Sequence, residues 1–385
     1  MRKIGIDSHY LEGKRTGVGR YLSNLLKVWN TIAPPDVKFI LYFRKEIPLD
    51  LKLGKKFDLK LLKYGKFSNA FFMHWLLRKK AKKDRVDVLF CPGYIAPVFY
   101  NGSIALTIHD IIYEARPDLY KLNFVDRILL RGVSKISSRK AKTIFVPSEF
   151  TKKELIRFYD IDKEKILVTP LAVDDCFFSK KISKEKENLI KKKYNVQGKF
   201  VLYIGTIFNR RHIPEIIKAF ALLVKKREFF KDKHSLQFLI VGRNKTLPFI
   251  DIDKLINEVN NDLNRRAILR YNFINSSDLF YLYHLSELFI YISEYEGFGL
   301  PLLEAMVCKT PVITSPFASI PEVVGESAIF VKNPNNIKEI SNAIYTGLTD
   351  KKLRENLINK GIEQVKKFSW EKCAEKTLKA LLSIC

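Results

Sequence analysis

Two successive series of short apolar runs constrain the fold of this chain most strongly. Each run is followed by turn residues and then by a longer amphipathic stretch. The runs of the first series cover residues 38–43, 86–90, 103–107 and 143–146, and those of the second cover residues 200–204, 236–241 and 288–292. Buried strands that alternate with helices are typical of a parallel sheet with helices on both faces. The sequence therefore predicts an α/β fold with two doubly wound domains.

The length of the chain supports the same division. A single hydrophobic core rarely organises more than roughly 250–300 residues, and this chain has 385. The strand pattern restarts with a lysine-rich helix expected at 180–194. We therefore expect one Rossmann-like domain at residues 1–176 and a second at 177–368. Because such domains bind ligands at the carboxyl ends of their strands, we expect the two edges to face each other across a central cleft.

The net charge of +27 is high for a metabolic enzyme and indicates an anionic partner. Residues 1–100 alone hold 21 basic and 8 acidic side chains. Within them, the aromatic and aliphatic stretch 67–77 runs into a basic cluster at 78–83. Such a helix lies either against an anionic membrane surface or, as an ordinary amphipathic helix, against the sheet. No nucleic-acid partner is expected, because no recognition module accompanies the basic residues.

The sequence shows no pattern of membrane insertion or export. No apolar stretch reaches the roughly 18 residues that a spanning helix needs, and residues 1–7 lack the apolar core of a signal peptide. The five cysteines are scattered without C-x2-C spacing, which argues against a disulfide framework and a zinc site. We expect a cytoplasmic protein, with or without peripheral contact to the inner membrane face.

Residues 293–306 carry the most specific motif, Ser-Glu-Tyr-Glu-Gly-Phe-Gly-Leu-Pro-Leu-Leu-Glu-Ala-Met. Glu296 and Glu304 flank a glycine-rich turn, and Pro301 suits the first turn of a helix that follows it. Free amides at a helix start attract an anion, and carboxylates accept hydrogen bonds from sugar hydroxyls. The motif therefore predicts a nucleotide-sugar site. In the alternative interpretation, each glutamate only caps a turn or pairs with a lysine.

Arg210 and Arg211 lie in the loop 205–213, which follows a predicted strand and precedes an amphipathic helix expected at 214–225. Arginine stays charged and offers a planar fork of donors, so the pair suits a diphosphate and the charge that develops on a leaving nucleotide. The alternative is a loop with two solvated arginines.

The first domain contributes two weaker candidates. His109 and Asp110 follow the predicted strand 103–107, where a histidine is more often structural than functional unless other site residues accompany it. Gly17 and Gly19 precede a helix expected to begin near Arg20, and such a pair lets the backbone approach a ligand. The third glycine of a dinucleotide fingerprint is missing, which disfavours a nicotinamide cofactor.

No metal site is expected. Asp251 and Asp253, or Asp174 and Asp175, superficially suggest a divalent cation, but neither pair follows a predicted strand. Arginines and a helix N-terminus supply the positive charge that a cation would otherwise provide. We therefore expect neither a metal nor another cofactor.

Taken together, these motifs resemble the E-x7-E signature and the accompanying motifs of the family 4 glycosyltransferases, which have the GT-B fold. The resemblance covers almost the whole chain and rests on residues 4–7, 17–21, 107–110, 146–150, 205–211, 293–306, 308–314, 320–325 and 368–370. It implies that the final helix, residues 369–385, packs back onto the first domain.

The resemblance also implies roles for individual residues. Glu304 would bind the ribose hydroxyls, Glu296 the hydroxyls of the donor sugar, and His109 the transferred sugar, with Arg210 and Arg211 on the diphosphate. The catalytic set is then His109, Arg210, Arg211 and Glu296, and the donor-binding set is Gly17, Gly19, Gly205, Gly297, Phe298, Gly299, Leu300 and Glu304.

The implied activity is metal-independent, retaining transfer of a hexose from a nucleoside-diphosphate sugar to a hydroxyl of a glycan or lipid-linked acceptor, in synthesis of a surface polysaccharide or glycolipid. GDP-mannose is the first expectation for the donor, followed by UDP-glucose or another UDP-hexose. A nucleotide-sugar hydrolase or epimerase and a non-catalytic binding protein are the alternatives. Lys309 favours the last of these, because the family usually has glycine there and the change is expected to alter the local turn.

Overall fold

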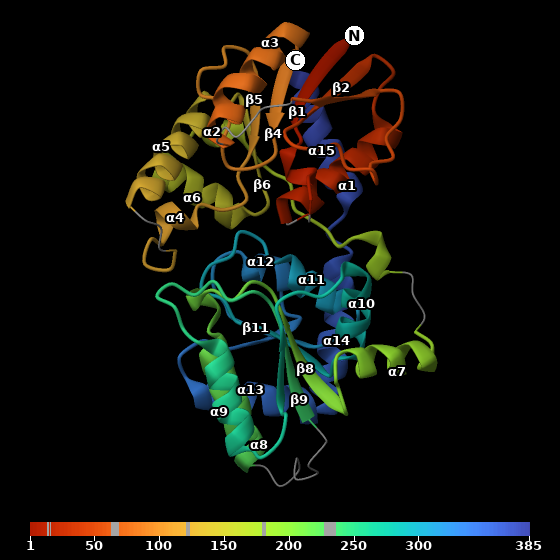
Figure 1. Ribbon diagram of the computed structural model, residues 1–385, viewed down its shortest axis with the longest axis vertical. Helices are drawn as coiled ribbons and strands as arrows, with labels where there is room; N and C mark the ends of the chain where they lie inside the picture. The colour runs from red at the N-terminus through yellow and green to blue at the C-terminus, as the bar shows by residue number, and fades with distance from the viewer. Residues whose placement is uncertain (14, 16, 63–68, 121–123, 179–181, 227–235) are drawn as a thin grey trace. The chain divides into compact units, whose positions relative to one another are not determined.

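The chain folds into two compact units, seen in a computed structural model that describes residues 1–385 apart from 14, 16, 63–68, 121–123, 179–181 and 227–235 (Figure 1). One unit comprises Met1–Leu171 and Ser369–Cys385, and the other comprises Ala172–Phe368. The division after Leu171 precedes the expected one at residue 176. Phe177, which belongs to the second unit under either division, packs its ring against Phe280 and Tyr283.

The first unit contains a seven-stranded parallel sheet in the order β3-β2-β1-β4-β5-β6-β7. Its strands are β1 (Arg2–Asp7), β2 (Val37–Phe43), β3 (Phe57–Leu61), β4 (Val88–Cys91), β5 (Ser103–Thr107), β6 (Thr143–Val146) and β7 (Ile166–Val168). The apolar runs did not include β1, which carries Arg2, Lys3 and Asp7 at its ends, and they did not predict β3 and β7. Both are edge strands with mostly half-buried residues, so neither requires a continuous apolar run.

Helices cover this sheet on both faces. They are α1 (Gly17–Ile32), α2 (Asn69–Phe71), α3 (Arg78–Asp84), α4 (Ile112–Ala115), α5 (Phe124–Lys140), α6 (Glu149–Tyr159) and α15 (Trp370–Ser383), together with the short turns η1 (His9–Leu11) and η3 (Lys163–Lys165). The first helix begins at Gly17 rather than near Arg20.

The C-terminal helix α15 lies beside α1 (Figure 1). The indole nitrogen of Trp29 on α1 donates a hydrogen bond to the carbonyl of Ala374 on α15, at 2.9 Å. Ser369 begins α15 by accepting a hydrogen bond from the amide of Lys372. The last residues of the chain therefore complete the first unit and not the second.

The segment expected as a helix at 67–83 forms α2, the π-helical turn η2 (Phe72–Leu77) and α3, while residues 67–68 lie outside the described part. Met73, Leu77 and Ala81 enter the core of the first unit. The apolar face thus packs on the sheet, as an ordinary amphipathic helix does. Trp75, by contrast, is 56% exposed. Within the described ranges, no helix has both the length and the apolar character that crossing a membrane requires.

The second unit contains a six-stranded parallel sheet in the order β10-β9-β8-β11-β12-β13. Its strands are β8 (Lys199–Ile204), β9 (Leu236–Val241), β10 (Ile268–Tyr271), β11 (Leu288–Tyr291), β12 (Val312–Thr314) and β13 (Ala328–Phe330). The sequence patterns missed β10, β12 and β13. Each has only three or four residues, which is too short to give a distinctive apolar run.

The helices of the second unit are α7 (Lys184–Lys193), α8 (Ile213–Lys226), α9 (Ile252–Asp262), α10 (Ser276–Leu285), α11 (Leu300–Val307), α12 (Ile320–Val324), α13 (Ile337–Thr349) and α14 (Lys351–Val365), with the turns η4 (Asp175–Phe177) and η5 (Asn209–Arg211). The first begins later than the expected position 180, because Ser183 caps it by accepting a hydrogen bond from the amide of Lys186.

Both sheets have the strand order of a doubly wound fold, which confirms the predicted fold class. In such sheets the order reverses beside the first strand, and ligands bind at the carboxyl ends of the strands at that point. In the second unit, the reversal lies between β8 and β11. The loops that leave these two strands carry Arg210, Arg211 and Glu296.

Candidate functional site

The glycine-rich turn after β11 leads directly into α11, as the sequence predicts. Gly299 has φ of 108° and immediately precedes the helix, and Pro301 lies in its first turn. The backbone angle requires glycine, and the space is also tight, because a Cβ atom on Gly299 would approach Leu302 Cδ1 to 3.0 Å. The turn therefore presents the backbone amides at the start of α11 to any ligand at this edge of the sheet.

An ion pair joins the turn after β8 to the turn after β11. Both Nε and Nη2 of Arg211 lie 2.9 Å from Glu296 Oε1. Arg210 Nε is 3.9 Å from the same oxygen and donates a hydrogen bond to the carbonyl of Tyr295 at 3.1 Å. These three side chains are only 9–12% exposed. The structure thus brings both arginines and Glu296 into one buried cluster, and neither arginine is the solvated group of the alternative interpretation.

The electrostatics of this cluster keep Arg211 and Glu296 ionised. Burial favours the neutral form of Glu296, but Arg211 and then Arg210 outweigh it and lower the pKa of the Glu296 carboxyl. Burial also opposes the charge on Arg211, whose pKa is nevertheless raised by Glu296 and by the rings of Tyr291 and Tyr203. A permanent positive charge therefore persists inside a largely dry site.

Gly205 makes room for this arrangement. It has φ of 151°, and a Cβ atom there would lie 2.7 Å from Arg211 Nη1. The same Nη1 donates a hydrogen bond to the carbonyl of Thr206 at 2.7 Å. Besides its predicted contact with the donor, Gly205 therefore has a structural role, because it lets the Arg211 guanidinium pass close to the backbone.

Arg210 retains hydrogen-bonding capacity that the described residues do not use. Its Nη1 is buried and has no hydrogen-bond partner among them, although its guanidinium lies 4.3 Å from the centre of the Phe208 ring. A buried donor without an acceptor costs roughly 1–3 kcal/mol, and more when the group is charged. An anion from solvent that reached this nitrogen would remove that cost.

Glu304 has different partners from Glu296. It lies on α11, is 2% exposed, and its Oε2 accepts a hydrogen bond from the phenol of Tyr283 at 2.8 Å. Sequence reasoning missed Tyr283, because a tyrosine within α10 carries no local sign of a function. Its phenol orients the carboxylate predicted to bind ribose.

Two serines hold the loop around Glu296. Ser293 Oγ donates to Glu296 Oε1 at 2.9 Å, and Ser319 Oγ lies 2.8 Å from the carbonyl of Glu296 and 3.1 Å from that of Phe298. Ser319 was not predicted, because it belongs to the segment before α12 and meets this loop only in the folded unit. Both hydroxyls restrain the turn that carries Glu296, Gly297 and Phe298.

Lys309 adopts the backbone conformation that glycine adopts most easily. Its φ is 61°, in the left-handed region, and its amide donates a hydrogen bond to the carbonyl of Met306 at 3.0 Å. The expectation of an altered turn stays a prediction, because this φ is one that glycine would also adopt without strain. The lysine takes the left-handed conformation, and the cost of that conformation is strain of roughly 1 kcal/mol or more.

His109 lies after β5 in the first unit, and its ring is neutral. Burial lowers its pKa to about 4, although a hydrogen bond with Pro92 opposes the shift. Nε2 is 2.9 Å from the carbonyl of Pro92, which only accepts, so the ring proton is on Nε2 and Nδ1 is left as an acceptor. Asp110 accepts hydrogen bonds from the amide of Ile112 and the phenol of Tyr94, which agrees with a role in orienting the loop.

The two glycines at the start of α1 differ in their surroundings. A Cβ atom on Gly19 would lie 2.4 Å from the carbonyl oxygen of Tyr10, whereas a Cβ on Gly17 would meet nothing within 4 Å. Gly19 is therefore needed for packing within the chain itself. The proposed contact of both glycines with the donor stays a prediction.

Among the described residues, no group of three or more His, Cys, Asp or Glu side chains could hold a metal ion. The two aspartates near residue 252 have structural partners. Asp251 caps α9 through the amide of Lys254, and Asp253 pairs with Arg270 at 2.6 Å.

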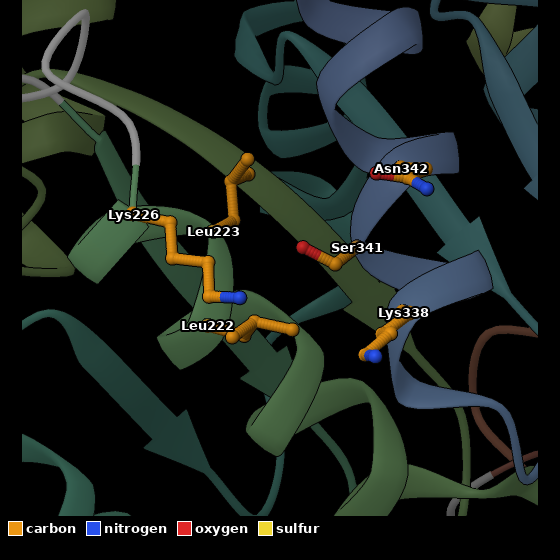
Figure 2. A pocket seen from close by; sticks show the side chains of 6 residues that line it. All are labelled: Leu222, Leu223, Lys226, Lys338, Ser341 and Asn342. Carbon is orange, nitrogen blue, oxygen red and sulfur yellow. The ribbon is translucent and has the colours of Figure 1, made fainter.

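A pocket of about 330 Å³ lies between α8 and α13 (Figure 2). It is lined by Leu222, Leu223, Lys226, Lys338, Ser341 and Asn342. None of the predicted site residues lines it. The polar cluster at the ends of β8 and β11 therefore remains the candidate site of the second unit.

Two family models match consecutive parts of the chain. Residues 16–176 match the model described as Glycosyltransferase Family 4, and residues 184–364 match the model described as Glycosyl transferases group 1. The first model covers most of the first unit, and the second covers both turns with the arginine and glutamate cluster.

Curated relatives extend the match over nearly the whole chain. The O-antigen chain mannosyltransferase B of Escherichia coli is 29% identical over 385 residues, covering 95% of each chain. The O-antigen chain mannosyltransferase RfbU of Salmonella typhimurium is 27% identical over 274 residues, covering 71% of this chain and 68% of the relative.

Solved structures share the fold. The glycosyltransferase WaaG, involved in lipopolysaccharide biosynthesis, superposes with a TM-score of 0.74 at 14% identity over 99% of both chains. Anabaena HepE, in complex with UDP and glucose, superposes with a TM-score of 0.72 at 15% identity over the full length of both chains. At these identities, the likeness establishes the fold alone.

Proposed function

Because this chain belongs to the group 1 glycosyltransferases, we propose that it transfers a mannosyl group from a nucleoside-diphosphate sugar to a hydroxyl of a glycan or lipid-linked acceptor. The named mannosyltransferase relatives support mannose as the transferred sugar. GDP-mannose is the proposed donor, and UDP-glucose is the first alternative to be tested.

The buried cluster of Arg210, Arg211 and Glu296 carries this proposal. Arg211 is already oriented by Glu296, while Arg210 Nη1 has no hydrogen-bond partner in the described part of the chain. A diphosphate is a suitable ligand for two neighbouring guanidinium groups, because each offers parallel N–H donors. The amides at the start of α11 lie on the same loop as Glu296 and add donors for the phosphate oxygens.

The cluster suits the charges that glycosyl transfer develops. As the anomeric bond breaks, positive charge grows on the sugar and negative charge on the departing phosphate. We assign the stabilisation of that phosphate to Arg210 and Arg211, which are fixed before the reaction and therefore need little reorganisation. Glu296 accepts hydrogen bonds from sugar hydroxyls, and Glu304, oriented by Tyr283, accepts them from the ribose.

We further propose that the reaction retains the anomeric configuration, with the acceptor hydroxyl attacking from the face that the phosphate leaves. Retaining glycosidases instead use two carboxylates that flank the scissile bond, one of them as nucleophile. Glu296 is engaged by Arg211 and Ser293, and this pairing supports a binding role rather than a nucleophilic one. The leaving phosphate then accepts the acceptor's proton.

His109 is proposed to accept a hydrogen bond from a hydroxyl of the transferred sugar through Nδ1. The hydrogen bond from Nε2 to Pro92 supports this role, since it leaves Nδ1 as the acceptor of the ring. The lowered pKa of His109 keeps the ring neutral at physiological pH. Neither a metal ion nor another cofactor is needed in this scheme, because the two arginines supply the positive charge.

We propose that the protein reaches a lipid-linked acceptor by binding to an anionic membrane surface. The proposed location is then the cytoplasmic face of the membrane. Trp75 and Phe99 are 56% and 68% exposed, and the Arg78 guanidinium lies 5.4 Å from the centre of the Trp75 ring. An exposed indole beside basic side chains is typical of a helix that lies at a lipid headgroup layer.

A nucleotide-sugar screen followed by a transfer assay tests the proposal. GDP-mannose is expected to raise the melting temperature by mass action more than UDP-glucose does, and to be consumed only when an acceptor is present. The Arg211→Ala, Glu296→Ala and His109→Ala variants are expected to lose most of the transfer while remaining folded. Nucleotide release without an acceptor would instead identify a hydrolase, and donor binding without any turnover would identify a binding protein.

A further inference from the structure

The two loops of the arginine and glutamate cluster are joined by more than the ion pair itself. The amide of Glu294 donates a hydrogen bond to the carbonyl of Arg210 at 3.0 Å, and Arg210 Nε donates one to the carbonyl of Tyr295. Next to Arg211, the ring of His212 has its Nε2 2.8 Å from Glu294 Oε1. Two side-chain pairs, Arg211 with Glu296 and His212 with Glu294, therefore bridge the same two segments.

His212 has a backbone conformation that needs support. Its φ is 50°, in the left-handed region that most residues other than glycine avoid, although histidine adopts it more often than most, and the residue is only 6% exposed. Such conformations persist where surrounding contacts impose them. The contact with Glu294 is one of these, and a weaker contact joins His212 Nδ1 to Glu215 Oε2 at 3.7 Å.

We propose that His212 and Glu294 are positioning residues that form a latch, which holds Arg211 against Glu296 before the donor binds. The proposal rests on the function given above, because the diphosphate is the ligand that the held arginines would bind. The latch acts through Arg210 and Arg211, and neither His212 nor Glu294 contacts the reacting atoms.

The physical basis is the short connection between the two pairs. Arg211 and His212 are adjacent, and Glu294 and Glu296 are separated by one residue, so a displacement of either loop stretches both pairs. A displacement of about 1 Å of a positioning group lowers catalysis on the order of a hundredfold. Loss of the latch is therefore expected to lower donor affinity and the transfer rate more than the stability of the fold.

Glycine and asparagine variants of His212 separate this role from backbone strain. Glycine tolerates a positive φ at no steric cost, and asparagine tolerates it better than most residues. His212→Gly is expected to fold at least as stably as the wild type, yet to bind GDP roughly tenfold more weakly and to transfer with roughly ten- to hundredfold lower kcat/KM. His212→Asn is expected to behave similarly, because its side chain is too short to reach Glu294.

Variants of the carboxylates supply the rescue and the control. Glu294→Gln keeps an oxygen that accepts a hydrogen bond from His212 and is expected to retain most of the GDP affinity, whereas Glu294→Ala is expected to lose as much as His212→Gly. Glu215→Ala removes the other carboxylate near His212 and is expected to leave GDP affinity within about twofold, because a 3.7 Å contact is weak. Unchanged GDP affinity in both His212→Gly and Glu294→Ala would overturn the latch.

A thermal double-mutant cycle tests the latch without any activity assay. The fall in melting temperature caused by Glu296→Gln is expected to be about 2–4 °C smaller in the His212→Gly background, because the loop is then no longer held. Additive shifts in the cycle would overturn the latch whether or not the enzyme turns over. A wild-type protein that binds neither GDP nor UDP would overturn the proposed function, and the thermal cycle would still decide the latch.

Discussion

Replacing Lys309 by glycine is expected to stabilise the second unit. Lys309 has φ of 61°, and its side chain is exposed. A left-handed conformation costs a residue with a side chain roughly 1–2 kcal/mol, whereas the greater freedom of glycine in the unfolded chain offsets roughly 0.5–1 kcal/mol of the gain. The expected net increase in the free energy of unfolding is therefore about 0.5–1 kcal/mol. For a domain of this size, that is a rise in melting temperature of about 1–4 °C.

Equilibrium unfolding in urea measures this difference, and Lys309→Ala is the matched control. Both variants remove the lysine charge, which contributes together with burial to the lowered pKa of His284. Only the glycine variant removes the strain, so it should be more stable than Lys309→Ala by about the same net 0.5–1 kcal/mol. If Lys309→Gly is no more stable than Lys309→Ala, the reasoning about strain is wrong.

The same variant tests whether Lys309 silences the enzyme. Because the turn already has a left-handed conformation, the position of α11 and of Glu304 should not change when glycine replaces lysine. We expect the transfer rate of Lys309→Gly to stay within about twofold of the wild type, since surface substitutions away from a site have small effects. A large gain of activity in Lys309→Gly would instead support the non-catalytic alternative for the natural chain.

Three further predictions concern individual side chains of the site. The pKa of Glu296 is lower in the folded state than in the unfolded state. The stability that Glu296 contributes is therefore present above its unfolded pKa and is lost as pH falls through its folded pKa. In urea unfolding between pH 6 and 3, the free energy of unfolding should fall less steeply for Glu296→Gln than for the wild type. The pKa of His109 is about 4, so this residue should cause no change in the transfer rate near pH 6.5. A change in rate near pH 6.5 that disappears in His109→Gln would show that the ring is not neutral at physiological pH. Tyr283→Phe removes the phenol that orients Glu304. It should weaken GDP binding by about tenfold or more in calorimetry, because a hydrogen bond to a charged group contributes roughly 1.5–3 kcal/mol; unchanged affinity would exclude that role.

Local patterns in the sequence could predict the elements that form from neighbouring residues. Central strands such as β8 and β11 are apolar, apart from Lys199 at the start of β8, because both faces of the sheet are covered. The start of α11 was predicted because Gly299 and Pro301 meet its steric needs within a few residues. Resemblance to a known family added the roles of Glu296 and Glu304, which spacing alone left open.

Tertiary structure decided what depends on residues distant in the chain. Arg211 and Glu296 are 85 positions apart, and they meet because β8 and β11 are neighbours in the sheet. The pairing of His212 with Glu294 and the support of Glu304 by Tyr283 depend equally on that packing. Residue types and local periodicity therefore determined the two doubly wound domains and the candidate residues. Only the folded sheet determined which charges neutralise each other and which guanidinium nitrogen is left for a ligand, because burial and pairing are properties of the assembled unit.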